Sequence, residues 1–400
     1  MHIHVQATDE QDTRTALGRL TARLAEERAA PPGFLSVYAS AAHDADLVRG
    51  AFAGSGATSV HGGTSCQGVM AGGRMIARDG YGIGYFALWD EDGAFGTGLA
   101  PLGGDPRAAA RAAVIEALDM ARRPGETPEL IWLTAAPGAE EALIAGIEDV
   151  VGANAPILGG SAADNDLTGG WRVFDTTRAE TAGVAVSVLF PSSQVASAYQ
   201  SGYVPTAKSG KVTRAAGRRI QQIDDRPAAE VYAGWTDGAV AADAAHAAEG
   251  PAMILSESTL HPLGRHVGDV ADVPFYLLAH PATVHPDGSI ELFADLDEGE
   301  RVTLMTGSPD SLVSRAGRVA SLSAQRGGFA VDDIAGALVI FCGGCMLAVR
   351  DRMDTVADEV DRALGGAPSL GIFTFGEQGA VLGEQNCHGN LMISCVTFAR

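Results

Sequence analysis

The stretch Gly371–Gly379, GIFTFGEQG, ends an apolar run and carries one carboxylate, Glu377, and one amide, Gln378. Glycines frame it, which predicts a tight turn between two buried strands, because glycine adopts backbone angles that other residues avoid. The polar group Asn386–Asn390 (NCHGN) follows, and then an apolar strand predicted over Leu391–Phe398. A carboxylate in such surroundings is costly to bury without a partner. Glu377 is therefore the first candidate for a ligand-binding residue, and the alternative is an exposed turn.

The order strand, helix, strand, polar turn, strand occurs three times along the chain, at residues 34–89, 130–190 and 337–398. The other two polar turns are Gly62–Gly68 (GGTSCQG) and Gly160–Asp166 (GSAADND). This pattern predicts an internal β-α-β-turn-β repeat, although unrelated units with the same local order would also produce it. Strand–helix–strand units favour parallel pairing and tight turns favour antiparallel pairing. We therefore expect an α/β to α+β fold with mixed sheets flanked by helices.

The segment 195–306 lacks this order and is rich in short strand candidates, with helical patterns only at 227–236 and 239–248. A chain of 400 residues exceeds what one core usually organises. We expect two domains, residues 1–200 and 201–400, with the boundary near the Pro191-Ser192-Ser193 stretch.

The chain is strongly acidic, with a formal net charge of −21 at pH 7. Such a surface repels phosphate backbones and anionic lipid, so we expect no nucleic-acid or membrane partner. Five scattered cysteines do not resemble a secreted disulfide framework. The first 13 residues do not resemble a signal peptide, and no apolar run has the length of a membrane span. These features predict a soluble cytoplasmic protein.

The first polar turn contains Thr64, Ser65 and Cys66 between glycines. Hydroxyls and exposed backbone N–H groups of this kind can bind an anion without a cationic side chain. Cys66 could act as a nucleophile only with a base close by, and His61 is the one candidate near it in sequence. The alternative for Cys66 is a small buried residue.

The second turn offers Ser161, Asp164 and Asn165, whose carboxylate and amide suit an ammonium or hydroxyl group of a ligand. Asp and Asn also stabilise turns by bonding to nearby backbone, so both roles stay open. Gln378 and Asn390 supply further amides in the third copy.

Cys342 and Cys345 form a CxxC motif at the end of a predicted strand, and Cys387-His388 lies some forty residues later. Together they would provide a Cys3His zinc site. The same CxxC could instead be a redox pair, or the thiols could simply line the core or a ligand pocket. Walker A, dinucleotide GxGxxG, HExxH and GxSxG motifs are absent from the sequence, so no familiar enzyme class is indicated.

Several motifs in a fixed order resemble the FIST family, which has an N-terminal and a C-terminal FIST domain. They are GGTSCQG (62–68), ILGGSAADND (157–166), GYVP (202–205), KVTR (211–214), IQQIDDRPA (220–228), FCGGC (341–345) and FTFGEQG (373–379). The resemblance implies a cytoplasmic sensory protein that binds small ligands such as amino acids and signals through a separate partner, for example a histidine kinase. Some FIST-like proteins resemble haem-binding nitric-oxide sensors. A haem ligand here would be His388, or else Cys342 or Cys345.

Three hypotheses follow from the sequence. In the first, the protein is a small-ligand sensor whose pocket is built from the polar turns. The second is a haem- or metal-dependent gas or redox sensor that uses the four Cys/His residues. The third is a hydrolase or transferase with Cys66 or a serine as nucleophile.

Overall fold

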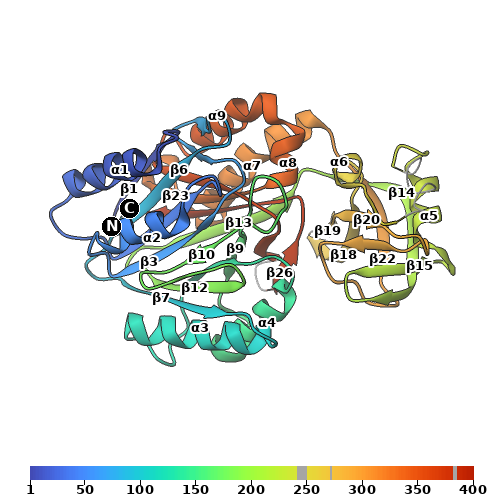
Figure 1. Cartoon of the computed structure of the whole chain (residues 1–400), viewed down its shortest axis with the longest axis horizontal. Helices are drawn as coiled ribbons and strands as arrows, with labels where there is room; N and C mark the ends of the chain where they lie inside the picture. Colours follow the sequence, from blue (N-terminus) through green and yellow to red (C-terminus); the bar gives the residue numbers. More distant parts are fainter. Residues whose placement is uncertain (241–249, 271–272, 382–384) are drawn as a thin grey trace.

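The computed structural model describes residues 1–400 apart from 241–249, 271–272 and 382–384. Three six-stranded sheets form a large body with helices on its outside, and a further sheet lies beside this body (Figure 1). No described helix has the length and apolar character needed to cross a membrane.

Three units with the same order of elements build the body. The first contains β1 (His2–Thr8), α1 (Thr13–Glu27), β2 (Phe34–Ala39), α2 (Ala45–Ala53), β3 (Ser59–Thr64) and β6 (Ile83–Trp89). The second contains β7 (Ala94–Pro101), α3 (Pro106–Ala121), β8 (Leu130–Ala135), α4 (Glu140–Val151), β9 (Ile157–Ser161) and β12 (Gly183–Phe190). The third contains β13 (Val195–Ser201), α7 (Pro309–Gly327), β23 (Ile334–Cys342), the short α8 (Gly343–Ala348), α9 (Met353–Ala363), β24 (Ser369–Thr374) and β27 (Met392–Ala399).

Strand pairing is the same in all three units, with the orders β1-β6-β2-β3, β7-β12-β8-β9 and β13-β27-β23-β24. The strands joined by the second helix run parallel, and the last strand returns antiparallel to the first of them. The predicted internal repeat and the mixed sheets are confirmed. Each repeat is longer than predicted, because it also includes a preceding strand and helix.

Each unit places a short hairpin on the sheet of another unit. The hairpins are β4 (Val69–Ala71) with β5 (Arg74–Ile76), β10 (Val173–Phe174) with β11 (Ala179–Glu180), and β25 (Glu377–Val381) with β26 (Gln385–Gly389). They pair with β24, β3 and β9 respectively, which links the three sheets in a closed cycle. Glycine permits the close approach, since a Cβ on Gly62 would lie 1.9 Å from the Phe174 ring and one on Gly160 2.3 Å from the Thr374 methyl group.

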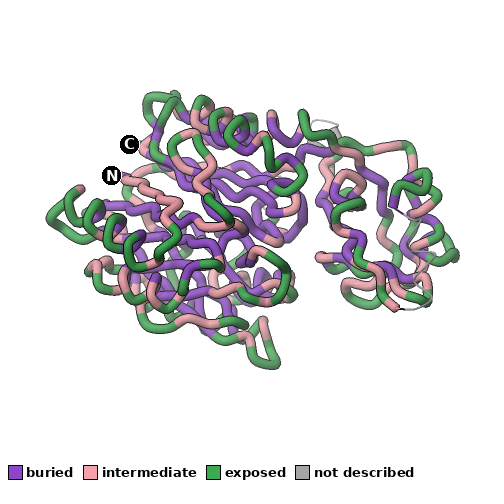
Figure 2. The backbone as a smooth tube through the Cα atoms, turned by 45° about the horizontal axis from the view of Figure 1, so that its top comes forward, coloured by how far each residue is buried: buried purple, intermediate pink, exposed green. Residues whose placement is uncertain are grey.

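The inner faces of the three sheets share an apolar core, and the helices cover the outer faces. Strand β2 shows the alternation expected of a sheet buried on both sides. Its Phe34 and Tyr38 face the shared core, whereas Leu35 and Val37 pack with α1 and α2. Figure 2 shows buried strands at the centre of the body and exposed segments around it.

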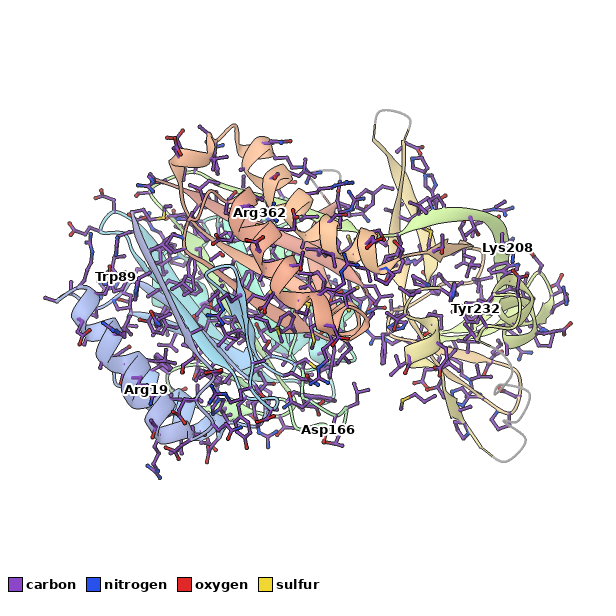
Figure 3. The ribbon with its side chains drawn as sticks, turned by 90° about the horizontal axis from the view of Figure 1, so that it is seen from above. Arg19, Trp89, Asp166, Lys208, Tyr232 and Arg362 are labelled. Atoms are coloured by element: carbon purple, nitrogen blue, oxygen red, sulfur yellow. The ribbon has the colours of Figure 1, made fainter. Side chains whose placement is uncertain are left out.

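The chain between β13 and α7 forms the inserted sheet. Its elements are β14 (Val204–Ala216), β15 (Arg219–Ile223), β16 (Arg226–Pro227), α5 (Ala228–Trp235), β17 (Ala252–Met253), α6 (Leu255–Ser258), β18 (Leu263–Val270), β19 (Val273–Ala279), β20 (Pro281–Val284), β21 (Ile290–Leu292) and β22 (Arg301–Thr306). It has its own apolar core, which includes Val212, Tyr232 and Leu304. In Figure 3 Lys208 and Tyr232 lie on this part, apart from the body. The predicted domain boundary at residue 200 falls beside the link from β13 to β14, while residues after 306 return to the body.

Some local predictions differ from the structure. The predicted turn at 371–379 is wrong for Glu377 and Gln378, because β24 ends at Thr374 and β25 already begins at Glu377. Helices α3 and α7 were not predicted. The helix predicted at 239–248 lies largely outside the described residues.

Candidate functional site

The ends of β3, β9 and β24 meet in the middle of the body. The Ser161 amide donates to the Gly376 carbonyl at 2.8 Å, and the Cys66 amide donates to the Phe373 carbonyl at 3.0 Å. The Ala163 amide donates to the Thr64 carbonyl at 3.0 Å. The three polar segments singled out in the sequence therefore lie together, joined largely by their own backbone groups.

Thr64 and Ser65 are buried and already have protein partners. The Thr64 hydroxyl accepts from the Arg172 amide at 3.0 Å. The Ser65 hydroxyl donates to the Gly68 carbonyl at 2.5 Å and accepts from the Phe373 amide at 2.8 Å. These hydroxyls hold the junction of the units, and anion binding by them stays a prediction.

Cys66 is buried, and burial raises the pKa of its thiol to about 12. The proposed base His61 is engaged elsewhere, with Nδ1 2.8 Å from the Ser187 hydroxyl and Nε2 2.8 Å from the Thr134 hydroxyl. Burial also lowers the pKa of His61 to about 3. The pairing of Cys66 with His61 as nucleophile and base is therefore wrong.

Asp164 and Asn165 organise their own surroundings. The Asp164 carboxylate accepts from the amides of Leu167, Gly169 and Gly170 at 2.7–2.8 Å. The Asn165 side chain accepts from the Gln67 amide at 2.6 Å and so joins the second turn to the first. This geometry favours the turn-forming role over ligand contact for both residues.

Glu377 is fully buried and has only neutral partners. One carboxyl oxygen accepts from the Thr374 hydroxyl at 2.9 Å and the other from the Met392 amide at 3.0 Å. Burial, reinforced by the nearby Cys342, raises the pKa of this carboxyl well above its ordinary value. Burial therefore favours the neutral form of Glu377, and the interpretation of Glu377 as an exposed turn residue is wrong.

The four predicted metal ligands are not gathered into one site. Cys342 and Cys345 are buried where β23 meets α8, and the Cys345 thiol lies 3.6 Å from the Tyr203 hydroxyl. Cys387 and His388 are consecutive on β26, so their side chains point to opposite faces. Within the described part of the chain no three His, Cys, Asp or Glu side chains are placed to hold a metal ion. The predicted Cys3His set is not assembled, and all five thiols are free.

An ion-pair cluster lies where the body meets the inserted sheet. From the turn between β14 and β15, the Arg218 guanidinium reaches Glu140 at 2.5 Å and Glu141 at 2.9 Å, both in the first turn of α4. Asp295 of the inserted sheet lies 3.5 Å from the same guanidinium. The Ser161 hydroxyl donates to the buried Glu140 carboxylate at 2.5 Å. Burial would raise the pKa of Glu140, but His388, Arg218 and Ser161 together lower it to about 2.

His388, Gln378 and Asn390 extend this cluster along β25 and β26. His388 and Ser161 flank Gly376, since a Cβ there would lie 2.5 Å from the imidazole and 3.3 Å from the hydroxyl. His388 Nε2 donates to the Phe293 carbonyl at 3.0 Å, and Nδ1 lies 3.4 Å from the side-chain amide nitrogen of Gln378. The side-chain carbonyl oxygen of Gln378 is buried, and none of the described residues is its hydrogen-bond partner.

Comparison with protein families gives two matches in sequence order. The FIST N domain matches residues 33–226, and the FIST C domain matches residues 228–380. The chain belongs to the FIST family. FIST domains are generally small-ligand sensory domains in signal transduction. The border between the two FIST matches falls inside the inserted sheet, at β16.

Other comparisons add little to this FIST assignment. No curated protein matches the chain. The solved structures similar to it include PurLQS from Thermotoga maritima, with 10% identity, 77% of this chain and 73% of that chain covered, and a TM-score of 0.21. PurL of the same organism complexed with ATP has 10% identity, coverages of 77% and 72%, and a TM-score of 0.20. These TM-scores are too low to support an argument about fold or function.

Four residues at the interface between the body and the inserted sheet were not predicted from the sequence: Glu140, Glu141, Arg218 and Asp295. The sequence contained a signal for the first two, because Glu140 and Glu141 begin the helix that follows the carboxyl end of the parallel strand β8, where ligands often bind in α/β sheets. Arg218 and Asp295 carry no such signal, since only the docking of the inserted sheet brings them to α4.

A separate hollow of about 690 Å³ lies at the opposite ends of the strands. It is lined by Met1, Trp89, Phe95 and Arg122 among others, and none of the predicted site residues lines it. This hollow and the predicted site residues are therefore separate features of the protein.

Proposed function

We propose that this protein is a cytoplasmic sensor that binds an amino acid or similar small metabolite where β25 and β26 face the inserted sheet. The unpartnered carbonyl oxygen of Gln378 supports this most directly. A buried polar atom without a hydrogen bond costs about 1–3 kcal/mol, and a bound water, ion or ligand that pairs with the atom removes this cost. A ligand N–H group would satisfy it.

The surroundings of Gln378 suit a small polar ligand. Ser161 and Asn390 were both predicted as ligand-binding residues, and His388, whose imidazole touches Gln378, was predicted as a metal ligand. The side-chain carbonyl oxygen of Asn390 accepts from the backbone amide of His280, in the inserted sheet, at 3.1 Å. Binding at this place would change contacts between body and inserted sheet. We propose that a separate signalling protein, such as a histidine kinase, reads that change.

Thermal-shift measurements with amino acids, amines and small carboxylates test the proposal. A ligand that raises the melting temperature of the wild type should lose its effect in Gln378→Met, which keeps the side chain's length but removes the amide. Gln325→Met, at an exposed position of α7, is the matched control and should respond like the wild type. Equal shifts in wild type and Gln378→Met would place the ligand elsewhere and refute this site.

A further inference from the structure

The Arg218 guanidinium binds between carboxylates that come from two parts of the chain. Glu140 and Glu141 belong to the body, whereas Asp295 belongs to the inserted sheet together with Arg218 itself. The Arg218 side chain is mostly buried, and Glu140 is almost completely so. The Arg218 side chain therefore extends across the interface, and its guanidinium lies among carboxylate oxygens of the body.

The charges and hydrogen-bond acceptors of this cluster favour binding of a cation. Three carboxylates face a single guanidinium, so the cluster stays negative even with Arg218 in place, apart from any charge on His388. Without Arg218 the buried Glu140 would keep only the Ser161 hydroxyl and the Gly138 amide as partners. Buried carboxylates without a counter-ion are strongly disfavoured. Gln378, whose side chain contacts His388 next to this cluster, adds a buried acceptor oxygen, so a ligand that reaches it must bring hydrogen-bond donors.

We propose that Arg218 occupies this site as a built-in substitute for a small cationic metabolite that carries a guanidinium or similar donor group. This inference rests on the proposed function, since it names the ligand class and the regulation of the same site. In the absence of ligand, Arg218 closes the site and holds the inserted sheet on α4. A free guanidinium compound displaces Arg218 from Glu140 and binds in its place.

Displacement of Arg218 would loosen the inserted sheet, because few other polar contacts join it to the body here. The Asp295 backbone amide donates to the Glu141 carboxylate at 2.9 Å, and His388 bonds to the Phe293 carbonyl. Asn390 donates through its backbone amide to the Leu278 carbonyl at 2.8 Å and accepts at its side-chain oxygen from the His280 amide at 3.1 Å. The ligand and Arg218 compete for the same carboxylates, so ligand binding favours release of the inserted sheet from α4.

Calorimetric titration with agmatine, which has a guanidinium and an ammonium group but no carboxylate, tests this proposal. We expect Arg218→Ala to bind agmatine at least tenfold more tightly than the wild type, because the internal competitor is gone. Arg219→Ala, which removes the neighbouring exposed arginine and its pair with Asp287, is the matched control and should bind like the wild type. Glu140→Gln added to Arg218→Ala should abolish the gain.

Hydrogen exchange of the wild type provides a second readout that does not depend on the folding of any variant. Saturating agmatine should speed the exchange of amides at 217–219 and in the first turn of α4 at least fivefold. Glutarate, an anion of similar length, should not.

Equal agmatine affinity in Arg218→Ala and wild type, or unchanged exchange in wild type, overturns the inference. If some other compound then binds in a Gln378-dependent manner, the sensor proposal stands and only the role of Arg218 is refuted. If no compound binds either protein, both proposals fail.

Discussion

Replacing Glu377 by glutamine should stabilise the protein at neutral pH, although it removes a buried side chain that has two hydrogen bonds. The fold favours the neutral form of this carboxyl, because burial raises its pKa well above the ordinary 4.5. Glutamine has the same shape and can accept from the Met392 amide through its carbonyl oxygen. Its NH2 group faces the Thr374 hydroxyl, which can turn and accept.

The size of the effect follows from proton linkage. Above pH 4.5 the unfolded chain releases the Glu377 proton while the folded chain keeps it, so the free energy of unfolding falls as pH rises. The loss is about 1.4 kcal/mol per pH unit until the folded pKa is reached. Glutamine does not titrate and avoids this loss.

Urea unfolding of wild type and Glu377→Gln between pH 5.5 and 8, followed by the fluorescence of the buried Trp132, measures the difference. The variant's advantage should widen by about 1.4 kcal/mol per pH unit over the lower part of this range. Glu129→Gln, at an exposed position, should show no such trend. A variant that is less stable than wild type by the same amount at every pH would show that Glu377 is ionised in the folded protein, and the reasoning would be refuted.

Three further predictions concern other buried groups. Thr134→Val removes one hydrogen bond from His61 Nε2 and one from the Tyr38 hydroxyl, which keep only Ser187 and Trp132 as partners. It should cost about 2–4 kcal/mol in thermal or urea unfolding, whereas Thr134→Ser should cost much less. Glu140→Gln should cost about 3 kcal/mol at pH 7; because the folded pKa of Glu140, about 2, lies below its ordinary 4.5, this difference should shrink as pH falls from 4.5 to 2. Cys66, whose pKa burial raises to about 12, should resist iodoacetamide in the native protein at pH 8, and mass spectrometry showing rapid labelling would contradict this.

The strands of the three units were predictable from local sequence. Strands β2 and β8 begin at residues 34 and 130, and β6 and β12 end at residues 89 and 190, which are the limits of the first two predicted units. These strands are short apolar runs bounded by turn residues, so the sequence marks their positions. Their common order along the chain was enough to predict the repeat and the mixed sheets.

Two helices escaped prediction for different reasons. Helix α3 buries a face made largely of alanines, such as Ala110, Ala113 and Ala117, so its amphipathic pattern is weak. Helix α7 carries stronger signals, since Ser308 forms a capping box ahead of Pro309 and Gly328 ends the helix. Those end signals could have identified it.

The exchange of hairpins could not be predicted from local sequence. Val69 pairs with Ile372, and Gln378 pairs with Gly159, across more than two hundred residues. Pairing at such distance is decided by how the three sheets close around their shared core. This is why Glu377 was expected in a turn, although it lies on a strand.

The candidate site arises where the inserted sheet breaks the symmetry of the three units. Strand pairing makes Thr64, Ser161 and Thr374 equivalent, each at the last position of its parallel strand. The hydroxyl of Thr64 bonds to backbone and that of Thr374 to Glu377, so both hold the junction together. The Ser161 hydroxyl instead donates to the charged Glu140, which the inserted sheet reaches through Arg218. A repeated hydroxyl thus has a structural role in two units and joins a charged interface in one, because a single unit carries an insertion long enough to fold back over its neighbour.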